Sequence, residues 1–358
     1  MRVFVNGRFL TQPMSGVQRF AYEILTALDD SLAATPDRLG PVEVLVPQPV
    51  PDPAWRVLRT RVVRGGRGHV WEQGALARAA RDGCLVSLGN SGPLRHACHV
   101  LCLHDAHIFD MPEAFDAAYR TLHRTLRPAL ARRARALITV SRHSARALSQ
   151  HLRVPRERFD IIPNSAEHVL RLPHDPGAPA RYGLTPGGYL LCVGNQSPNK
   201  NIAALAAAHA RAADRLPPLA LVGGAVPGVA LAQTGHGLGR VPDADLRGLY
   251  EGAAAFVFPS LNEGFGIPPL EAMQLGVPVI CARAGAMPEV LGTAPIWFDP
   301  RDTADITRAL RAFAALSPAA RTEMRVMGRA VAQAYRWRNS AEDLLAVIDR
   351  VSRARHAA

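Results

Sequence analysis

The chain of 358 residues is 48% hydrophobic and 20% charged, with a formal net charge of +12. At roughly 150 residues per domain this length predicts two domains, and the hydrophobic fraction excludes a disordered chain. No apolar run approaches the roughly 18 residues that span a bilayer, and the amino-terminal residues lack the apolar stretch of a signal peptide. We therefore expect neither an integral membrane protein nor a secreted or fibrous one.

The cysteines indicate a reducing compartment. There are five, an odd number, and most lie inside apolar stretches, as free core cysteines do. We expect a cytoplasmic protein in which all of them are reduced and buried: Cys84, Cys98, Cys102, Cys192 and Cys281.

The first half of the chain alternates strand and helix patterns. Apolar runs predict strands at residues 3–5, 42–46, 84–88, 99–103 and 137–140. Helices are predicted from about residue 17 and from residue 141, where apolar side chains recur at helical spacing. Strands that alternate with helices indicate a parallel sheet with helical crossovers.

A segment rich in proline and glycine, residues 161–188, separates this half from a second alternating half and is the best candidate for a domain junction. Beyond it, strands are predicted at residues 189–193, 219–222, 255–259 and 277–281, and helices at 202–213, 243–250, 268–275, 303–316, 318–335 and 340–353. The fold class is therefore α/β, with two doubly wound Rossmann-like halves. Ligands are expected in the cleft between them, at the carboxyl ends of the strands.

Two glutamates eight positions apart, Glu263 and Glu271, mark the densest group of candidate functional residues. Gly264 and Gly266 allow a ligand to approach the backbone, and the helix that follows offers unpaired N–H groups to phosphate. Carboxylates next to a phosphate site suit a ligand that also carries sugar hydroxyls. Alternatively, both glutamates are ordinary loop and capping residues.

Lys200 is the one lysine among 42 lysine and arginine residues. It lies in a loop between a predicted strand and a helix, where a compact ammonium suits a diphosphate. Two further candidates lie in the first half. Gly16 opens a helix after the first strand, and His104 follows the strand at residues 99–103, where an imidazole can bind a hydroxyl or move a proton.

Taken together, the motifs resemble the retaining GT-B glycosyltransferases of family 4, in particular the mannosyltransferase-like enzymes that build bacterial surface polysaccharides. The resemblance covers nearly the whole chain. It rests on NGRFLTQPMSGVQRFAYEIL, LHD, ITVSRHS, IIPNS, VGNQSPNKN, EGFGIPPLE and YRWRNSAEDLL, in that order. It implies an acceptor-binding domain at residues 1–168, on which a terminal helix at 337–358 packs, and a donor-binding domain at 169–336.

The resemblance also implies roles for single residues. The catalytic residues are Glu263, Lys200 and His104, and the donor-binding residues are Gly16, Asn195, Lys200, Val241, Glu263, Gly264, Phe265, Gly266 and Glu271. Glu271 would accept the ribose hydroxyls, Lys200 would face the departing diphosphate, and His104 would contact the sugar. Many relatives carry an arginine next to the lysine, where this chain has Asn195, Gln196 and Asn199.

The expected reaction is transfer of a hexose, with retention, from a nucleotide-sugar to a lipid-linked or oligosaccharide acceptor in exopolysaccharide, O-antigen or capsule synthesis. GDP-mannose is the first donor expected and a UDP-sugar the second. The resemblance implies a reaction without a metal or other cofactor, and Asp243-x-Asp245 is interpreted as a helix cap and first-turn acid rather than as a metal site. The alternatives are a glycoside phosphorylase or nucleotide-sugar synthase, and a non-catalytic nucleotide-binding protein.

The positive charge favours a peripheral location on the anionic inner face of the cytoplasmic membrane. The densest basic cluster, residues 120–135, is either a solvated helix face or a lipid-binding patch. No nucleic-acid partner is expected, because aromatic residues make up only 6% of the chain and do not interleave with a basic stripe.

Overall fold

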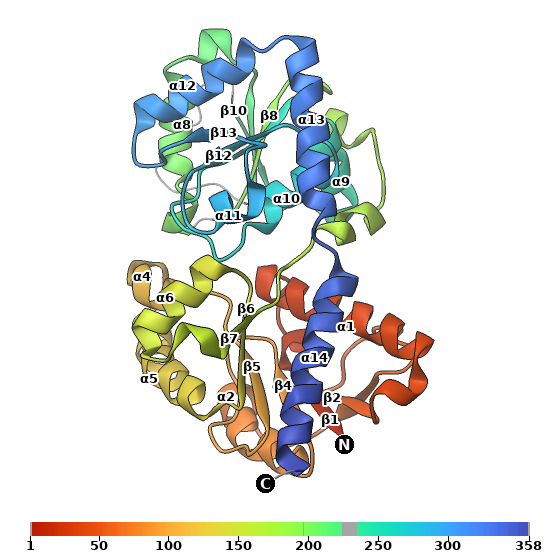
Figure 1. The fold of residues 1–358 in the computed structure, drawn as a ribbon. Helices are drawn as coiled ribbons and strands as arrows, with labels where there is room; N and C mark the ends of the chain where they lie inside the picture. The colour runs from red at the N-terminus through yellow and green to blue at the C-terminus, as the bar shows by residue number, and fades with distance from the viewer. Residues whose placement is uncertain (1, 196, 224–234, 357–358) are drawn as a thin grey trace. The chain divides into compact units, whose positions relative to one another are not determined.

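A computed structural model describes residues 2–195, 197–223 and 235–356 of the chain (Figure 1). It divides the protein into two compact units. The first comprises Met1–Asn164 together with Trp337–Ala358, and the second comprises Ser165–Arg336. Each unit has its own parallel sheet, which confirms the predicted α/β class with two Rossmann-like domains. Within the described ranges, no helix has both the length and the hydrophobicity that a membrane crossing requires.

The sheet of the first unit has seven parallel strands in the order β3-β2-β1-β4-β5-β6-β7. In that order the strands are Arg59–Val62, Val42–Val46, Val3–Asn6, Cys84–Ser87, His99–Cys102, Ala136–Thr139 and Phe159–Ile161. The strand order reverses between β1 and β4, and such reversals place ligand sites at the carboxyl ends of the two central strands.

The helices of this unit are α1 (Gly16–Ala34), α2 (Gly68–Trp71), α3 (Ala77–Ala79), α4 (His107–Asp110), α5 (Ala117–Arg133), α6 (Arg142–Leu152) and α14 (Trp337–His356). Local capping starts two of them. The Asp116 carboxylate accepts a hydrogen bond from the Tyr119 N–H at 2.8 Å, and Ser141 accepts one from the Ser144 N–H at 3.0 Å. These caps fix where α5 and α6 begin.

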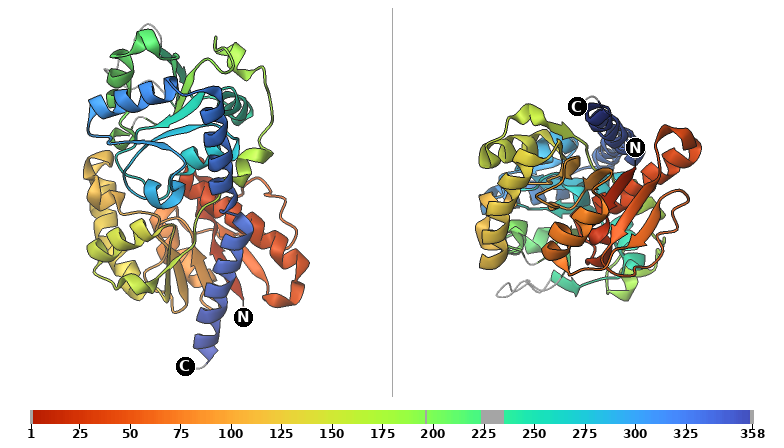
Figure 2. Two further views of the ribbon diagram at one scale, coloured as in Figure 1. Left: turned by 45° about the horizontal axis from the view of Figure 1, so that its top comes forward. Right: turned by 90° about the horizontal axis from the view of Figure 1, so that it is seen from below.

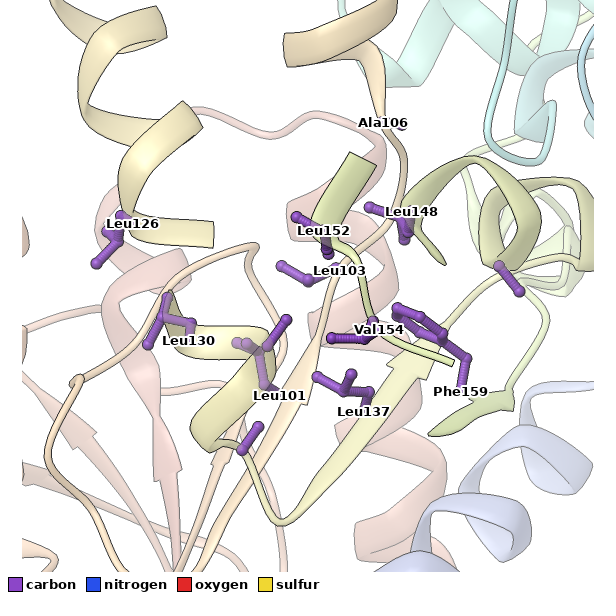
Figure 3. Close-up of a cluster of buried hydrophobic side chains, with 13 residues drawn as sticks. Leu101, Leu103, Ala106, Leu126, Leu130, Leu137, Leu148, Leu152, Val154 and Phe159 are labelled. Carbon is purple, nitrogen blue, oxygen red and sulfur yellow. The ribbon is translucent and has the colours of Figure 1, made fainter. Parts of the chain in front are cut away.

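A cluster of buried apolar side chains joins α5 and α6 to the sheet (Figure 3). Leu101, Leu137 and Phe159 come from three neighbouring strands and point toward the two helices. The helices contribute leucines at helical spacing: Leu126, Leu130, Leu148 and Leu152. Burial of each such side chain stabilises the fold by about 1.5–3 kcal/mol. The cluster therefore holds α5 and α6 against strands β5, β6 and β7.

The carboxy-terminal helix α14 belongs to the first unit and lies beside α1, as both views of Figure 2 and Figure 1 show. The Trp337 ring lies 6.0 Å from that of Phe20 in α1, and Ser340 Oγ donates a 2.7 Å hydrogen bond to the Pro163 carbonyl. The chain therefore crosses twice between the units, near Asn164 and near Trp337. The first of these crossings lies slightly before the predicted boundary at residue 168.

The second unit has a six-stranded parallel sheet in the order β10-β9-β8-β11-β12-β13. In that order the strands are Gly235–Gly239, Leu219–Val222, Leu190–Val193, Ala255–Phe258, Val279–Ala282 and Ile296–Phe298. Its helices are α7 (Ala178–Arg181), α8 (Ile202–Ala210), α9 (Asp243–Glu251), α10 (Ile267–Gln274), α11 (Met287–Leu291), α12 (Thr303–Ala314) and α13 (Pro318–Gln333). Here the strand order reverses between β8 and β11.

Candidate active site in the second unit

The loops that follow β8 and β11 meet at the point where the strand order of the second unit reverses. The Leu261 N–H donates to the Asn199 carbonyl at 2.8 Å, which joins the two loops through their backbones. From these loops, Lys200 Nζ and Glu263 Oε1 come within 2.6 Å of each other. The sequence singled out both residues, and the fold brings them into one ion pair at the expected ligand position.

The Lys200–Glu263 pair is partly covered, with 18% and 14% of the two side chains exposed. The ammonium also lies 5.3 Å from the centre of the Phe258 ring, at the end of β11. An aromatic face attracts a cation, so the ring helps to hold Nζ at the carboxyl edge of the sheet. A small remaining exposure keeps both charged groups accessible to a ligand.

Close backbone packing fixes the loop after β8. A Cβ added to Gly223, whose φ is +118°, would lie 1.9 Å from the Gly194 carbonyl oxygen. Only glycine permits this approach and this φ. The Asn195 Oδ1 accepts a 3.1 Å hydrogen bond from the Ser197 N–H, and the Asn195 side chain is exposed. Gln196 lies outside the described residues.

The loop that carries Glu263 is fixed by contacts with the loop that follows β12. The Ala286 N–H donates to the Glu263 carbonyl at 3.0 Å, and a Cβ on Gly285 would lie 2.5 Å from the Glu263 nitrogen. Gly266, at φ +94°, then turns the chain into α10. Phe265 is buried, and its ring meets that of Tyr335 edge-on at 5.4 Å. Gly264 to Gly266 therefore form an ordered turn in front of the α10 amino terminus.

Glu271 is held by two side chains that sequence analysis did not single out. Tyr250 Oη donates to its Oε2 at 2.9 Å, and His168 Nε2 lies 2.7 Å from its Oε1. Burial, with the neighbouring Glu271 charge, raises the pKa of Tyr250 well above its ordinary value, so the phenol stays protonated and donates. The result is a carboxylate fixed in orientation and still 15% exposed.

The two thiols in the strands of the second sheet, those of Cys192 and Cys281, are unsuited to nucleophilic catalysis. All five cysteines are free and buried, which confirms that prediction. Burial raises the pKa of Cys192, at the end of β8, to about 12, and raises that of Cys281 well above its ordinary value. Because the thiolate is the nucleophile, neither group is reactive at neutral pH.

Gly16 and His104 belong to the first unit, whereas the other predicted site residues belong to the second. Gly16 is the first residue of α1, after the β1 strand and its turn. The His104 ring is buried, which lowers its pKa, and its Nε2 lies 2.8 Å from the Leu88 carbonyl oxygen. The ring is therefore neutral with its proton on Nε2, which leaves Nδ1 as an acceptor.

Val241, the remaining predicted donor residue, is half-buried just after β10. Nearby, Asp243 and Asp245 both fall in the first turn of α9, although Pro242 rather than Asp243 occupies the cap position. Asp245 accepts hydrogen bonds from Tyr182 Oη at 2.7 Å and from Arg181. No three His, Cys, Asp or Glu side chains group as metal ligands in the part of the chain that the structure describes.

Comparison with known proteins agrees with this architecture. Residues 187–315 match the family model described as glycosyl transferases group 1. O-antigen chain mannosyltransferase B of Escherichia coli is 34% identical over 230 residues, which are 57% of this chain and 58% of that protein. The match thus spans less than two thirds of that relative's length.

Two solved structures share the fold over nearly their whole length. Sucrose-phosphate synthase from Thermosynechococcus elongatus superimposes with a TM-score of 0.74 at 17% identity, covering 99% of each chain. Anabaena Alr3699/HepE, in complex with UDP and glucose, gives 0.73 at 18% identity, covering 98% of this chain and 99% of that one. These likenesses confirm the predicted GT-B fold.

Proposed function

We propose that this chain, whose residues 187–315 form a glycosyl transferase group 1 domain, is a retaining hexosyltransferase that uses a nucleotide-sugar donor. The observation that carries the proposal is the Lys200–Glu263 pair at the switch point of the second sheet, with the oriented Glu271 carboxylate on the adjoining helix. This set offers one cation to a diphosphate and two carboxylates to sugar hydroxyls.

Each member of the set has a distinct task in the proposed reaction. Glu271, held by Tyr250 and His168, accepts hydrogen bonds from the ribose hydroxyls. Cleavage of the anomeric C–O bond builds negative charge on the diphosphate, which Lys200 and the α10 amino terminus stabilise. Glu263 binds hydroxyls of the transferred sugar and supports its positive charge.

Retention of configuration follows, in this proposal, from departure and attack on the same face of the sugar. The buried, protonated thiols of Cys192 and Cys281 supply no nucleophile for a double displacement. We propose that no metal takes part, since Lys200 supplies the positive charge that the leaving diphosphate requires. In this proposal Gly16 contacts the diphosphate, and the neutral His104 contacts the sugar as a hydrogen-bond acceptor at Nδ1.

We propose GDP-mannose as the first donor because the E. coli relative is a mannosyltransferase. A UDP-sugar is the second choice, since the HepE structure contains UDP and glucose. The proposed acceptor is a lipid-linked oligosaccharide in O-antigen or related polysaccharide synthesis. A net charge of +12 supports a peripheral place on the inner membrane face.

Thermal unfolding with a panel of GDP-, UDP-, ADP- and dTDP-sugars tests the donor site. A ligand at about 100 times its dissociation constant stabilises the folded state by about 2.7 kcal/mol. We expect GDP-mannose to raise the unfolding temperature of the wild type and of Glu323→Ala, an exposed control on α13, but not of Glu271→Ala. A panel without any shift contradicts the donor site.

Transfer of radiolabelled mannose to lipid-linked oligosaccharide, followed by NMR of the new linkage, tests the reaction. Retention requires that the donor and the product have the same anomeric configuration. Phosphate-dependent cleavage of a glycoside would identify a phosphorylase instead, and donor binding without turnover would identify a binding protein.

A further inference from the structure

The first unit contains a cavity that no predicted site residue lines. It has a volume of about 460 Å³ and lies beyond the carboxyl ends of β1, β2 and β3, beside the point where this sheet reverses its strand order. Three arginines line it, Arg8, Arg64 and Arg67, together with the amides of Gln12 and Gln48, and none of the lining residues is acidic. The cavity is thus both placed and charged to take an anion.

Arg8 is fixed in place at the wall of this cavity. Its Nε lies 3.2 Å from Glu72 Oε1, and its Nη2 donates to Ser91 Oγ at 2.8 Å. Glu72 is fully buried and also accepts hydrogen bonds from Asn6 Nδ2 at 2.9 Å and from Ser91 Oγ at 2.8 Å. The Arg8 guanidinium is therefore held in a fixed orientation, and the buried Glu72 carboxylate compensates its charge.

Arg64 and Arg67 supply the uncompensated charge. Both side chains are exposed, and neither forms an ion pair with any residue that the structure describes. Between them, Gly65 and Gly66 adopt φ values of +137° and +94°, which side-chain-bearing residues rarely adopt. This turn brings the two arginines to the same cavity and leaves about two positive charges there.

Two uncompensated charges match the charge of a phosphate monoester or diphosphate, about −1.5 to −2 for a monoester at neutral pH. Guanidinium forks bind such groups in bidentate fashion. We propose that this cavity binds a phosphate or diphosphate group of the acceptor, so that the acceptor is recognised through an anion in the first unit. This assignment to the acceptor rests on the proposed transferase function.

Calorimetric titration with inorganic pyrophosphate tests the site directly. All proteins carry Lys200→Gln, which removes the ammonium of the second unit as a competing partner. We expect Arg64→Gln/Arg67→Gln to raise the dissociation constant at least about tenfold. The matched control, Arg132→Gln/Arg133→Gln, changes two exposed arginines at the opposite end of the same sheet and leaves the constant within about twofold. The proposal is overturned if the two double variants lose equal affinity for pyrophosphate, or if neither loses any.

Because the four arginines are exposed, both double variants should unfold within about 2 °C of the parent. In the Lys200-containing background, GDP-mannose binding should persist in Arg64→Gln/Arg67→Gln. A wild type that binds none of the nucleotide-sugars contradicts the proposed function, whereas the pyrophosphate result still decides whether the cavity binds an anion.

A second arm separates a substrate phosphate from a membrane headgroup. Sedimentation with phosphatidylglycerol/phosphatidylcholine vesicles is compared with sedimentation with pure phosphatidylcholine vesicles. We expect vesicle binding to depend on Arg132 and Arg133 at least as much as on Arg64 and Arg67. If Arg64→Gln/Arg67→Gln loses vesicle binding and Arg132→Gln/Arg133→Gln keeps it, the cavity is a headgroup site and the acceptor assignment is wrong.

Discussion

Lys200 Nζ and Glu263 Oε1 are 2.6 Å apart, although the two residues are separated by 63 positions along the chain. With only 18% and 14% of the two side chains exposed, both groups lose most of their hydration on folding, and this cost offsets much of the Coulombic attraction between them. Stability therefore does not account for the pair. It keeps an ammonium and a carboxylate together at the carboxyl edge of the sheet, where the proposed donor would bind Lys200 through its diphosphate and Glu263 through its sugar hydroxyls.

Lys200→Ala should lower kcat by about 10²–10³-fold, the usual cost of removing one group that stabilises transition-state charge. Each single variant of the pair, Lys200→Ala or Glu263→Ala, should also unfold at a lower temperature, because it leaves the remaining charge largely covered and without its partner. Glu263→Ala should also lower kcat, and the double variant should lose less than the product of the two single losses, since both act on one reacting sugar diphosphate. Steady-state kinetics of the four proteins measure this, and strictly multiplicative losses would contradict a shared role.

Tyr250→Phe should raise the dissociation constant for the donor about tenfold while kcat changes no more than about twofold. The phenol positions Glu271 through a 2.9 Å hydrogen bond, and bonds to charged groups contribute about 1.5–3 kcal/mol. Tyr182→Phe is the matched control, because it removes a similar 2.7 Å bond to a different carboxylate, Asp245. Titration calorimetry should show that this control binds GDP-mannose with normal affinity. Equally weakened donor binding in both variants would contradict a positioning role for Tyr250.

The sequence predicted most strands of both sheets, because buried parallel strands read as short apolar runs. It missed the strands at both edges of both sheets, which are β3, β7, β10 and β13. All four residues of β3 are exposed, so no apolar pattern marks them. β10 has the sequence GHGLG, in which three glycines give no strand preference. For β3 and β10, backbone pairing with β2 and β9 rather than a sequence pattern defines the strand.

Within the candidate site, the unusual residues were predictable and their supports were not. Lys200 stands out by composition, and Glu263 and Glu271 by the glycines and prolines around them. His168 reaches Glu271 across 103 positions of sequence, a contact that only the folded unit creates. The same holds for Arg8 and Glu72, 64 positions apart by their residue numbers, whose pairing requires the first sheet to form.

Glu72→Gln should lower the free energy of unfolding of the first unit by about 3–5 kcal/mol at pH 7, because it leaves the Arg8 charge without its buried partner. Glu43→Gln is the control, since the Glu43–Arg61 pair is partly exposed and should cost no more than about 1 kcal/mol. Urea unfolding at pH 7 compares the two, and similar small losses would contradict the importance of the buried network.

The stability that Glu72 contributes should depend on pH in a definite direction. Burial opposes its ionisation, but the hydrogen bond to His69 and the Arg8 charge outweigh burial and hold its pKa below the ordinary 4.5. As the pH falls below 4.5, unfolded chains take up the proton before folded ones, so this contribution is lost. The difference in unfolding free energy between wild type and Glu72→Gln should therefore be constant above about pH 5 and shrink toward pH 3. A difference that grows on acidification would contradict the lowered pKa.

Gly223→Ala should disrupt the loop that carries Lys200. Its new Cβ would lie 1.9 Å from the Gly194 carbonyl oxygen, a backbone atom that cannot rotate away, so the two loops must separate. Gly183→Ala isolates the cost of a positive φ, because Gly183 has a φ of +69° and no atom near its Cβ position. That control should lose about 1–2 kcal/mol of unfolding free energy.

Gly223→Ala should lose clearly more, and the fraction that still folds should bind the donor less tightly, because a displaced Gly194 moves the start of the Lys200 loop away from Glu263. Thermal unfolding with and without GDP-mannose measures both effects in one experiment. If the two alanine variants are equally stable and bind the donor equally well, the contact between Gly223 and Gly194 does not fix the Lys200 loop.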